Sequence, residues 1–269
     1  SGKTESGQSV NVVYEGPAVK SMERIWWQVR IWDQNKKATD WSEPAFWETG
    51  ILKSEEWKSK WITLPDEPVS NESLPVHYYR KGFTLTKKVA SARLYITSYG
   101  LYKVFLNGRK VGDQLFTPGW TSFNKRLQYQ TYDVSEMLGR NNVIGAMLGD
   151  GWYRGFTLWQ GKNRYYGDKL AMLAQLQIEY TDGSAETITT DNSWKVSTGP
   201  ILKSDIYNGE FYDAKFESDG WNRAGFNDSA WKNAAELNLQ KENLVASIGV
   251  PVRAVEELKA VKRLTTPRG

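Results

Sequence analysis

Hydrophobic and polar positions alternate with a period of two over several short stretches of the chain. Residues 174–180 (AQLQIEY) place an apolar side chain at every second position and Gln or Glu between them. Successive side chains of a strand point to opposite faces, so this pattern predicts a half-buried β-strand. Residues 25–33, 93–97 and 102–106 alternate in the same way and are also predicted to be strands.

Turn signals separate these stretches. Asn107-Gly108 follows one predicted strand and Asp182-Gly183 follows another. Both dipeptides accept positive φ angles, so each predicts a β-hairpin. Short strands punctuated by turns are typical of a sandwich or jelly roll, and we therefore predict an all-β fold.

Few segments depart from the strand pattern. A short helix is predicted at residues 134–138, after the capping residue Asp133, and a second at residues 254–262. The polar segment at residues 64–74 contains two prolines and is predicted to be an exposed loop. The chain shows no internal repeat and no low-complexity tract.

The composition adds an excess of aromatic residues. The 269 residues suffice for one large β domain or two ordinary ones, and they include 13 Trp, 14 Tyr and 9 Phe. These rings either fill a sandwich core or lie exposed, where they stack on sugars or on a partner. Cysteine is absent from the sequence, which excludes disulfides, thiolate zinc sites and cysteine nucleophiles. The single histidine, His77, is predicted to be a partly exposed loop residue.

The charges indicate neither nucleic acid nor membrane as a partner. The 35 basic and 31 acidic residues are interspersed and give a net charge of only +4, which is no nucleic-acid signature. No apolar run approaches the roughly 18 residues of a membrane helix. We therefore expect no nucleic-acid partner and no membrane span.

Residues 25–50 (IWWQVRIWDQNKKATDWSEPAFWETG) resemble the last two strands of a fibronectin type III sandwich. The resemblance rests on the aromatic strand, the polar turn at residues 35–37 and the Trp41-Ser42-Glu43-Pro44 segment. A complete domain has about seven strands over roughly 100 residues, so we expect residues 1–50 to form an incomplete sandwich. This segment is expected to pack on the following module, to pack on a neighbouring molecule, or to be poorly ordered.

The rest of the chain resembles the N-terminal region of bacterial α-L-rhamnosidases. The motifs that carry this resemblance occur in order at residues 57–62 (WKSKWI), 78–85 (YYRKGFTL), 99–112 (YGLYKVFLNGRKVG), 118–138 (PGWTSFNKRLQYQTYDVSEML), 141–155 (NNVIGAMLGDGWYRG), 166–183 (YGDKLAMLAQLQIEYTDG) and 197–214 (STGPILKSDIYNGEFYDA). The resemblance implies a jelly-roll (galactose-binding-like) module over residues 51–249 and the truncated start of another β-sandwich over residues 250–269.

The resemblance also implies what the parent protein does. Members of this family hydrolyse terminal α-L-rhamnose and carry their catalytic carboxylates in an (α/α)₆ barrel, which is absent from this chain. We therefore expect the chain alone to be inactive. The implied partners are a rhamnose-containing glycan or glycoside and the missing C-terminal catalytic domain. The family's glycan-degrading members favour a periplasmic or secreted location.

Two loops supply the candidate site. In some members of the family a jelly roll binds rhamnose with help from calcium, and sugar binding needs an aromatic face together with carboxylates or amides. Residues 149–155 and 204–210 offer both kinds of group. The candidate sugar-binding residues are Asp150, Trp152, Tyr153, Asp205, Asn208 and Glu210. The candidate calcium ligands are Asp150, Asp168 and Asp205.

Two alternatives to sugar binding remain open. The aspartates also suit turn amides, the aromatic residues suit a core, and the whole module would then be a structural part that docks the catalytic barrel. A small enzyme would need two carboxyl groups flanking a bond. Glu210 and Asp213 are three residues apart and would point to opposite faces of a strand, so no catalytic residue is assigned.

Overall fold

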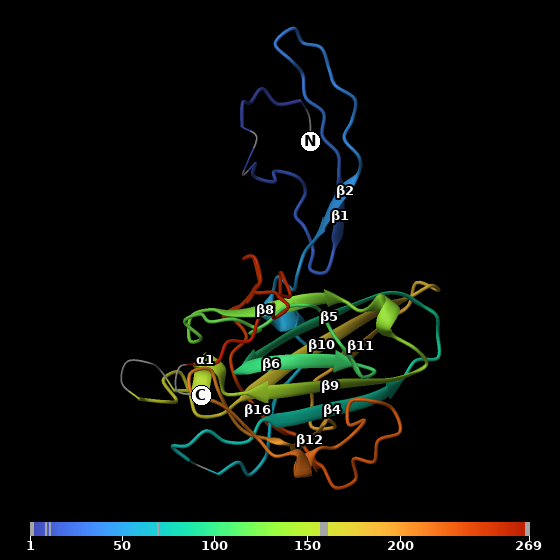
Figure 1. Cartoon of the computed structure of the whole chain (residues 1–269). Coiled ribbons are helices and arrows are strands. Elements are labelled where there is room, and N and C mark those ends of the chain that lie inside the picture. Colours follow the sequence, from blue (N-terminus) through green and yellow to red (C-terminus); the bar gives the residue numbers. More distant parts are fainter. Residues whose placement is uncertain (1–2, 9, 11, 69, 157–160, 267–269) are drawn as a thin grey trace. The chain divides into compact units, whose positions relative to one another are not determined.

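The computed structural model describes residues 3–8, 10, 12–68, 70–156 and 161–266, and these residues are nearly all β (Figure 1). The predicted all-β class is confirmed. The chain divides into two compact units, residues 1–57 and 58–269, whereas the sequence places a boundary after residue 50. Among the helices of the described residues, none has the length and hydrophobicity needed to cross a membrane.

The first unit contains one antiparallel hairpin of β1 (Arg24–Trp27) and β2 (Ala45–Glu48), followed by the 3₁₀ turn η1 (Ser54–Glu56). The predicted strand over residues 25–33 ends at Trp27. Beyond it, the hydroxyls of Ser42 and Thr39 accept the hydrogen bonds of nearby backbone N–H groups and so replace the carbonyl partners of a regular ladder.

This short hairpin leaves aromatic residues uncovered within the first unit. Trp26 is 59% exposed, and Trp27, Trp41 and Phe46 are exposed as well. A two-stranded ribbon has too little surface to bury such rings. The described part of this unit is therefore an incomplete sandwich.

The second unit is a sandwich of two sheets. The first sheet has the order β16-β3-β10-β5-β8-β17, with β11 paired to β10, and pairs antiparallel except for the parallel β17 and β8. Its strands are β3 (Trp61–Thr63), β5 (Val89–Tyr99), β8 (Leu127–Asp133), β10 (Ala171–Tyr180), β11 (Ala185–Thr189), β16 (Ala235–Leu237) and β17 (Leu244–Ala246).

The second sheet is antiparallel throughout and has the order β15-β12-β4-β9-β6-β7. Its strands are β4 (His77–Thr84), β6 (Leu101–Leu106), β7 (Arg109–Lys110), β9 (Asn141–Gly149), β12 (Lys195–Thr198) and β15 (Lys232–Asn233). A separate hairpin and three short helical turns complete the unit: β13 (Ile201–Asp205), β14 (Gly209–Tyr212), α1 (Gly151–Arg154), η2 (Ser135–Met137) and η3 (Ala214–Phe216).

The period-two pattern correctly predicts the inner face of the sandwich. The alternate apolar residues of β10, including Leu176 and Ile178, join one buried cluster with Tyr79 of β4 and Val104 of β6. The sequence predicts that only one face of β10 is buried, but the opposite face is also partly buried. Gln175 is buried there, and its side-chain oxygen accepts a hydrogen bond from the backbone N–H of Lys58 (2.8 Å).

Both predicted hairpin turns are confirmed. Asn107 and Gly108 have φ angles of 55° and 81° between β6 and β7, and Gly183 has a φ of 81° between β10 and β11. The predicted helix at residues 134–138 is the 3₁₀ turn η2, where Asp133 Oδ1 accepts a hydrogen bond from the backbone N–H of Ser135 (3.0 Å).

The helix predicted at residues 254–262 is wrong. The described residues 250–266 contain neither helix nor strand, and Val255, Leu258 and Val261 are almost fully exposed. A nine-residue helix is marginal in water unless an apolar face packs on a partner. The described residues provide no such partner.

Candidate functional site

The chain leaves β9 through a tight turn into α1, and this turn positions Asp150 and Arg154. Gly151 has a φ of 52°, and a Cβ atom there would lie 2.3 Å from the Leu101 side chain. Glycine therefore allows the chain to turn against β6. One helical turn further on, the Arg154 Nε donates a hydrogen bond to Asp150 Oδ1 (2.6 Å).

Arg154 is the centre of a buried charge network. Its Nη1 donates to Glu67 Oε2 (2.7 Å), and the second oxygen of Glu67 accepts a hydrogen bond from His77 Nε2 (2.7 Å). Burial would lower the pKa of Arg154, but the charges of Asp150 and Glu67 outweigh burial and raise it. Burial would likewise raise the pKa of Glu67, but His77 and Arg154 lower it.

The predicted exposed position of His77 is wrong. His77 is fully buried at the start of β4, where its Nδ1 lies 3.1 Å from the Tyr79 hydroxyl. The described residues of the polar segment 64–74 form a loop, as predicted, and Glu67 of this loop is a partner of His77. The histidine is buried because its ring nitrogens have polar neighbours there.

The Asp205 carboxylate accepts hydrogen bonds from backbone N–H groups. Its Oδ2 accepts from the N–H of Phe156 (2.7 Å), and its Oδ1 accepts from the N–H groups of Tyr207 (3.0 Å) and Asn208 (2.9 Å). These contacts match the alternative in which the aspartate holds turn amides. They tie the β13–β14 turn to the residue that follows α1.

The structure brings the Asp150 and Asp205 loops together through Ser73. The Ser73 hydroxyl donates to Asp150 Oδ2 (2.7 Å) and accepts from the backbone N–H of Ser204 (3.3 Å). Asp150 and Asp205 are both buried. Their oxygens therefore accept hydrogen bonds that hold the loops together.

The three predicted calcium ligands do not form a calcium site. The Asp168 side chain is 81% exposed and lies 3.8 Å from Arg164 Nη1, whereas Asp150 and Asp205 are buried among the donors described above. Calcium takes six to eight oxygen ligands. Among the described residues, no group of three or more His, Cys, Asp or Glu side chains is arranged to hold a metal ion. The residues present do not fit calcium.

The two predicted aromatic residues of α1 have different surroundings. Tyr153 packs between Tyr99 (4.9 Å between ring centroids) and Phe123 (5.4 Å), and burial raises its pKa to about 12. It belongs to the core. Trp152 stacks on Trp120, with centroids 5.5 Å apart and planes inclined by 7°.

Trp120, Trp152 and Phe116 form what we call the tryptophan platform. Phe116 lies 5.8 Å from Trp152, and the Trp120 Nε1 donates to the Tyr166 hydroxyl (3.1 Å). Trp120 is nonetheless 54% exposed. The platform is therefore a fixed aromatic surface open to solvent. Trp120 is absent from the predicted site because it lies far from Trp152 in sequence.

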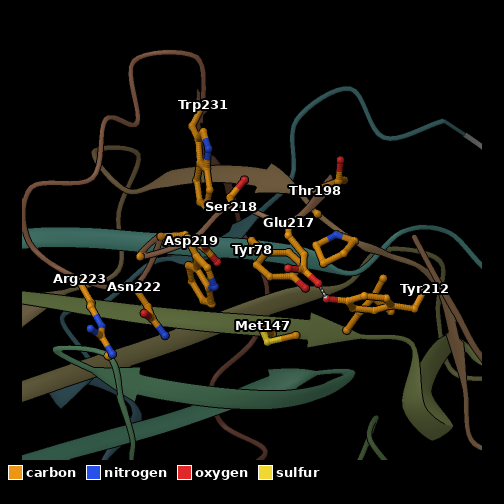
Figure 2. Close-up of a pocket in the computed structure, with 16 residues that line it drawn as sticks. Tyr78, Met147, Thr198, Tyr212, Glu217, Ser218, Asp219, Asn222, Arg223 and Trp231 are labelled. Atoms are coloured by element: carbon orange, nitrogen blue, oxygen red, sulfur yellow. Dashed lines mark hydrogen bonds between the residues drawn. The ribbon is translucent and has the colours of Figure 1, made fainter. Parts of the chain in front are cut away.

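A second feature is a pocket of about 620 Å³ on the outer face of the β12-β4-β9 sheet, shown in Figure 2. Tyr78, Met147, Tyr212 and Trp221 are among its lining residues. Burial first, and then the charges of Tyr212 and Glu210, raise the pKa of Tyr78 to about 12. Glu210 is exposed, and as residues i and i+2 of β14, Glu210 and Tyr212 share one face of the strand.

The remaining predicted residues have local roles. Asp213 Oδ1 accepts from the backbone N–H of Lys215 (3.0 Å) and so caps η3. Arg154 forms its ion pairs with Glu67 and Asp150.

Comparisons with known families and proteins match both units. Residues 87–256 match the family described as the α-L-rhamnosidase N-terminal domain, and residues 1–53 match a Rha78A-like N-terminal immunoglobulin domain. An α-L-rhamnosidase of Formosa agariphila is 39% identical over 220 residues, which are 78% of this chain and 24% of the relative. One from Alteromonas sp. is 37% identical over 216 residues, 77% of this chain and 23% of the relative. The chain spans about a quarter of the length of these curated relatives.

Solved structures give the same result. The α-L-rhamnosidase of Aspergillus terreus aligns with a TM-score of 0.93 and 37% identity, over 99% of this chain and 31% of that one. The Streptomyces avermitilis α-L-rhamnosidase, solved in complex with L-rhamnose, aligns with a TM-score of 0.84 and 25% identity, over 95% of this chain and 41% of that one.

Proposed function

The chain belongs to the α-L-rhamnosidase N-terminal domain family, and we propose that it is the non-catalytic N-terminal portion of an α-L-rhamnosidase. In this proposal the jelly roll holds a rhamnose-containing glycan or glycoside, and a catalytic domain elsewhere in the protein hydrolyses the terminal rhamnose. The similarity to α-L-rhamnosidases of Formosa agariphila, Alteromonas sp. and Aspergillus terreus supports the parent activity.

The tryptophan platform carries the sugar-binding part of this proposal. One face of a pyranose ring presents C–H groups, which pack on the negative face of an indole ring. Trp120 offers such a face, since it is exposed while its Nε1–H group and its stacking on Trp152 fix its orientation. A fixed ring loses little conformational entropy when a sugar binds.

The carboxylates around α1 support a role without catalysis. Glycoside hydrolysis needs two carboxyl groups that flank the scissile bond. Asp150 and Glu67 are instead held by Arg154, and Asp205 is held by backbone N–H groups. These side chains stabilise the loops that present Trp152.

Isothermal titration calorimetry with L-rhamnose tests the platform. We expect binding heat that a calcium chelator does not change, and at least a tenfold weaker affinity for Trp120→Ala, which is about 1.4 kcal/mol. Trp41→Ala removes a similarly exposed indole from the first unit and is the matched control. Absence of heat from the unmodified chain, or an equal loss in both variants, would reject sugar binding at the platform.

A second candidate function is structural docking onto the rest of the parent enzyme. It is favoured by exposed aromatic side chains on β14 and η3, where Phe211 is 61% exposed and Phe216 is also exposed. Exposed apolar side chains that lie close together are typical of contact surfaces. In a full-length α-L-rhamnosidase carrying this chain, Phe211→Asp should then lower the melting temperature, whereas it should leave the melting temperature of the isolated chain unchanged. An unchanged full-length enzyme would reject docking through Phe211.

A further inference from the structure

The pocket in Figure 2 is formed where the segment after η3 covers the outer face of the second sheet. Trp221 of this segment lies over Gly145 of β9, where a Cβ atom would come within 2.8 Å of the indole ring. Any larger residue at position 145 would therefore displace Trp221. Because Gly145 has no side chain, the sheet leaves space for Trp221, which lines the pocket.

A buried arginine fixes the covering segment. Arg80 Nε donates to the carbonyl of Trp221 (2.8 Å), its Nη2 donates to the carbonyl of Arg223 (3.1 Å), and its Nη1 forms an ion pair with Asp228. Arg80 is itself buried. Three contacts from one planar guanidinium hold the loop in place, so the pocket is formed before any ligand arrives.

Aromatic and apolar groups form one part of the lining. Tyr78 meets Trp221 edge to face at 5.0 Å, and Trp221 stacks against Trp231 at 6.3 Å with planes inclined by 24°. Met147 lies on β9 beside Tyr78, its neighbour in the sheet register. All four line the pocket, and Figure 2 labels Tyr78, Met147 and Trp231 among its lining residues. They offer surfaces for the C–H face of a ring.

Polar groups form the other part. The Tyr212 hydroxyl donates to Glu217 Oε1 (2.5 Å), which orients that carboxylate. Asp219, Asn222 and Arg223 also line the pocket. The lining therefore combines carboxylate acceptors, an amide that both donates and accepts, and guanidinium donors. Hydroxyl groups, which donate and accept, suit such a mixture.

The local charge is negative. Glu217 and Asp219 line the pocket, with Arg223 as the single basic side chain among the described lining residues. The hydrogen bond to Glu217, burial, and the charges of Glu217, Glu210 and Asp219 raise the pKa of Tyr212. Like charges close together are unfavourable, so an anionic ligand would be repelled here.

We propose that this pocket is a carbohydrate site for a neutral, polyhydroxylated sugar and that its carboxylates exclude uronic acids and sulfated sugars. Its volume of about 620 Å³ lies within the range of about 300–1,000 Å³ typical of small-molecule sites. It shares no lining residue with the tryptophan platform. The pocket is therefore a second binding site, separate from that of the proposed function.

The indole N–H resonances of the isotope-labelled chain test this directly, because each site has its own tryptophans. Rutinose, a neutral disaccharide of rhamnose and glucose, should shift the resonances of Trp221 and Trp231 in a saturable manner. D-glucuronic acid at neutral pH should bind at least tenfold more weakly. Shifts confined to Trp120 and Trp152 would overturn the pocket while supporting the platform.

Variants separate the roles of ring and charge. Tyr212→Ala should weaken rutinose binding at the pocket about tenfold, and Trp120→Ala should leave it unchanged. Combining Glu217→Gln with Asp219→Asn should reduce the discrimination against D-glucuronic acid. Glu136→Gln, an exposed carboxylate on η2, is the matched control. Rutinose and glucuronic acid binding equally well to the unmodified chain, or unchanged discrimination in the double variant, would overturn the proposal.

Discussion

At the scale of single residues, the buried contacts of Arg154 decide what the predicted aspartates do. Glu67 bridges Arg154 and His77, and Asp150 takes the other side of the guanidinium. A buried charge is stable only when it is paired and hydrogen-bonded. Asp150 is therefore part of the scaffold that holds α1, rather than a free ligand group.

Removing one member of this network should expose its energetic role. We expect Glu67→Gln to lower the free energy of unfolding by about 3 kcal/mol near pH 7, because it leaves Arg154 with one fewer buried partner. The pKa of Glu67 is lowered in the folded state, so its contribution is present above its unfolded pKa and is lost as the pH falls through the folded value.

Urea denaturation of both proteins measures this difference. The difference in the free energy of unfolding between Glu67→Gln and the unmodified chain should be largest at about pH 7. It should shrink between about pH 5 and pH 3. Glu136→Gln, whose carboxylate is exposed, should show no such difference. A difference that stays constant over this pH range would contradict the assigned role of Glu67.

The sequence could indicate which loops contribute to this charge network, but not which side chains pair within it. Asp150 and Asp205 stand beside turns, and the resemblance drew attention to both. Glu67, in contrast, lies in a polar segment with prolines, where composition predicts only exposure. Its partner Arg154 is distant along the chain, so only the folded sandwich brings the two together.

At the scale of elements, the strands of the sandwich follow the sequence closely, whereas the segment that covers the second sheet does not. Residues 93–97, 102–106 and 174–180 lie in β5, β6 and β10 as predicted. The alternation of apolar and polar residues in these strands indicates that each strand has one buried face. Residues 213–231 have no such period, because their position depends on Arg80 and on the space above Gly145.

We therefore predict that Arg80→Met frees the covering segment and leaves the sandwich folded. Hydrogen exchange should speed up at least tenfold for the amides of Trp221 and its neighbours, while β10 remains protected, because the lost hydrogen bonds are local to that segment. Lys103→Met, at an exposed position of β6 in the same sheet, should change neither region. Unchanged exchange around Trp221 in Arg80→Met would show that Arg80 does not hold the segment.

At the scale of the whole molecule, the two units differ in what holds them together. The buried apolar cluster of the sandwich contains residues from Ile62 to Ala234 and none from the first unit. Among its described residues, the first unit has as regular structure only the β1–β2 pairing and the 3₁₀ turn η1. Exposed backbone hydrogen bonds and few buried apolar contacts are features of low local stability.

Limited proteolysis should reveal this difference. We expect early cleavage within residues 1–57 and a resistant product that begins near Lys58, identified by mass spectrometry. Leu176→Ala truncates the core and destabilises the sandwich by about 2–5 kcal/mol. This variant should make the resistant product more sensitive to the protease. Equal cleavage rates in the two units of the unmodified chain would contradict the assigned difference in stability.

In the proposed function, this chain holds a rhamnoside without cleaving it. Proton NMR of the chain mixed with methyl α-L-rhamnoside measures both properties in one sample. We expect saturable shifts of the Trp120 indole resonance, while the glycoside remains intact and no free rhamnose forms. Accumulation of free L-rhamnose, or an indole spectrum unchanged over the whole titration, would contradict it.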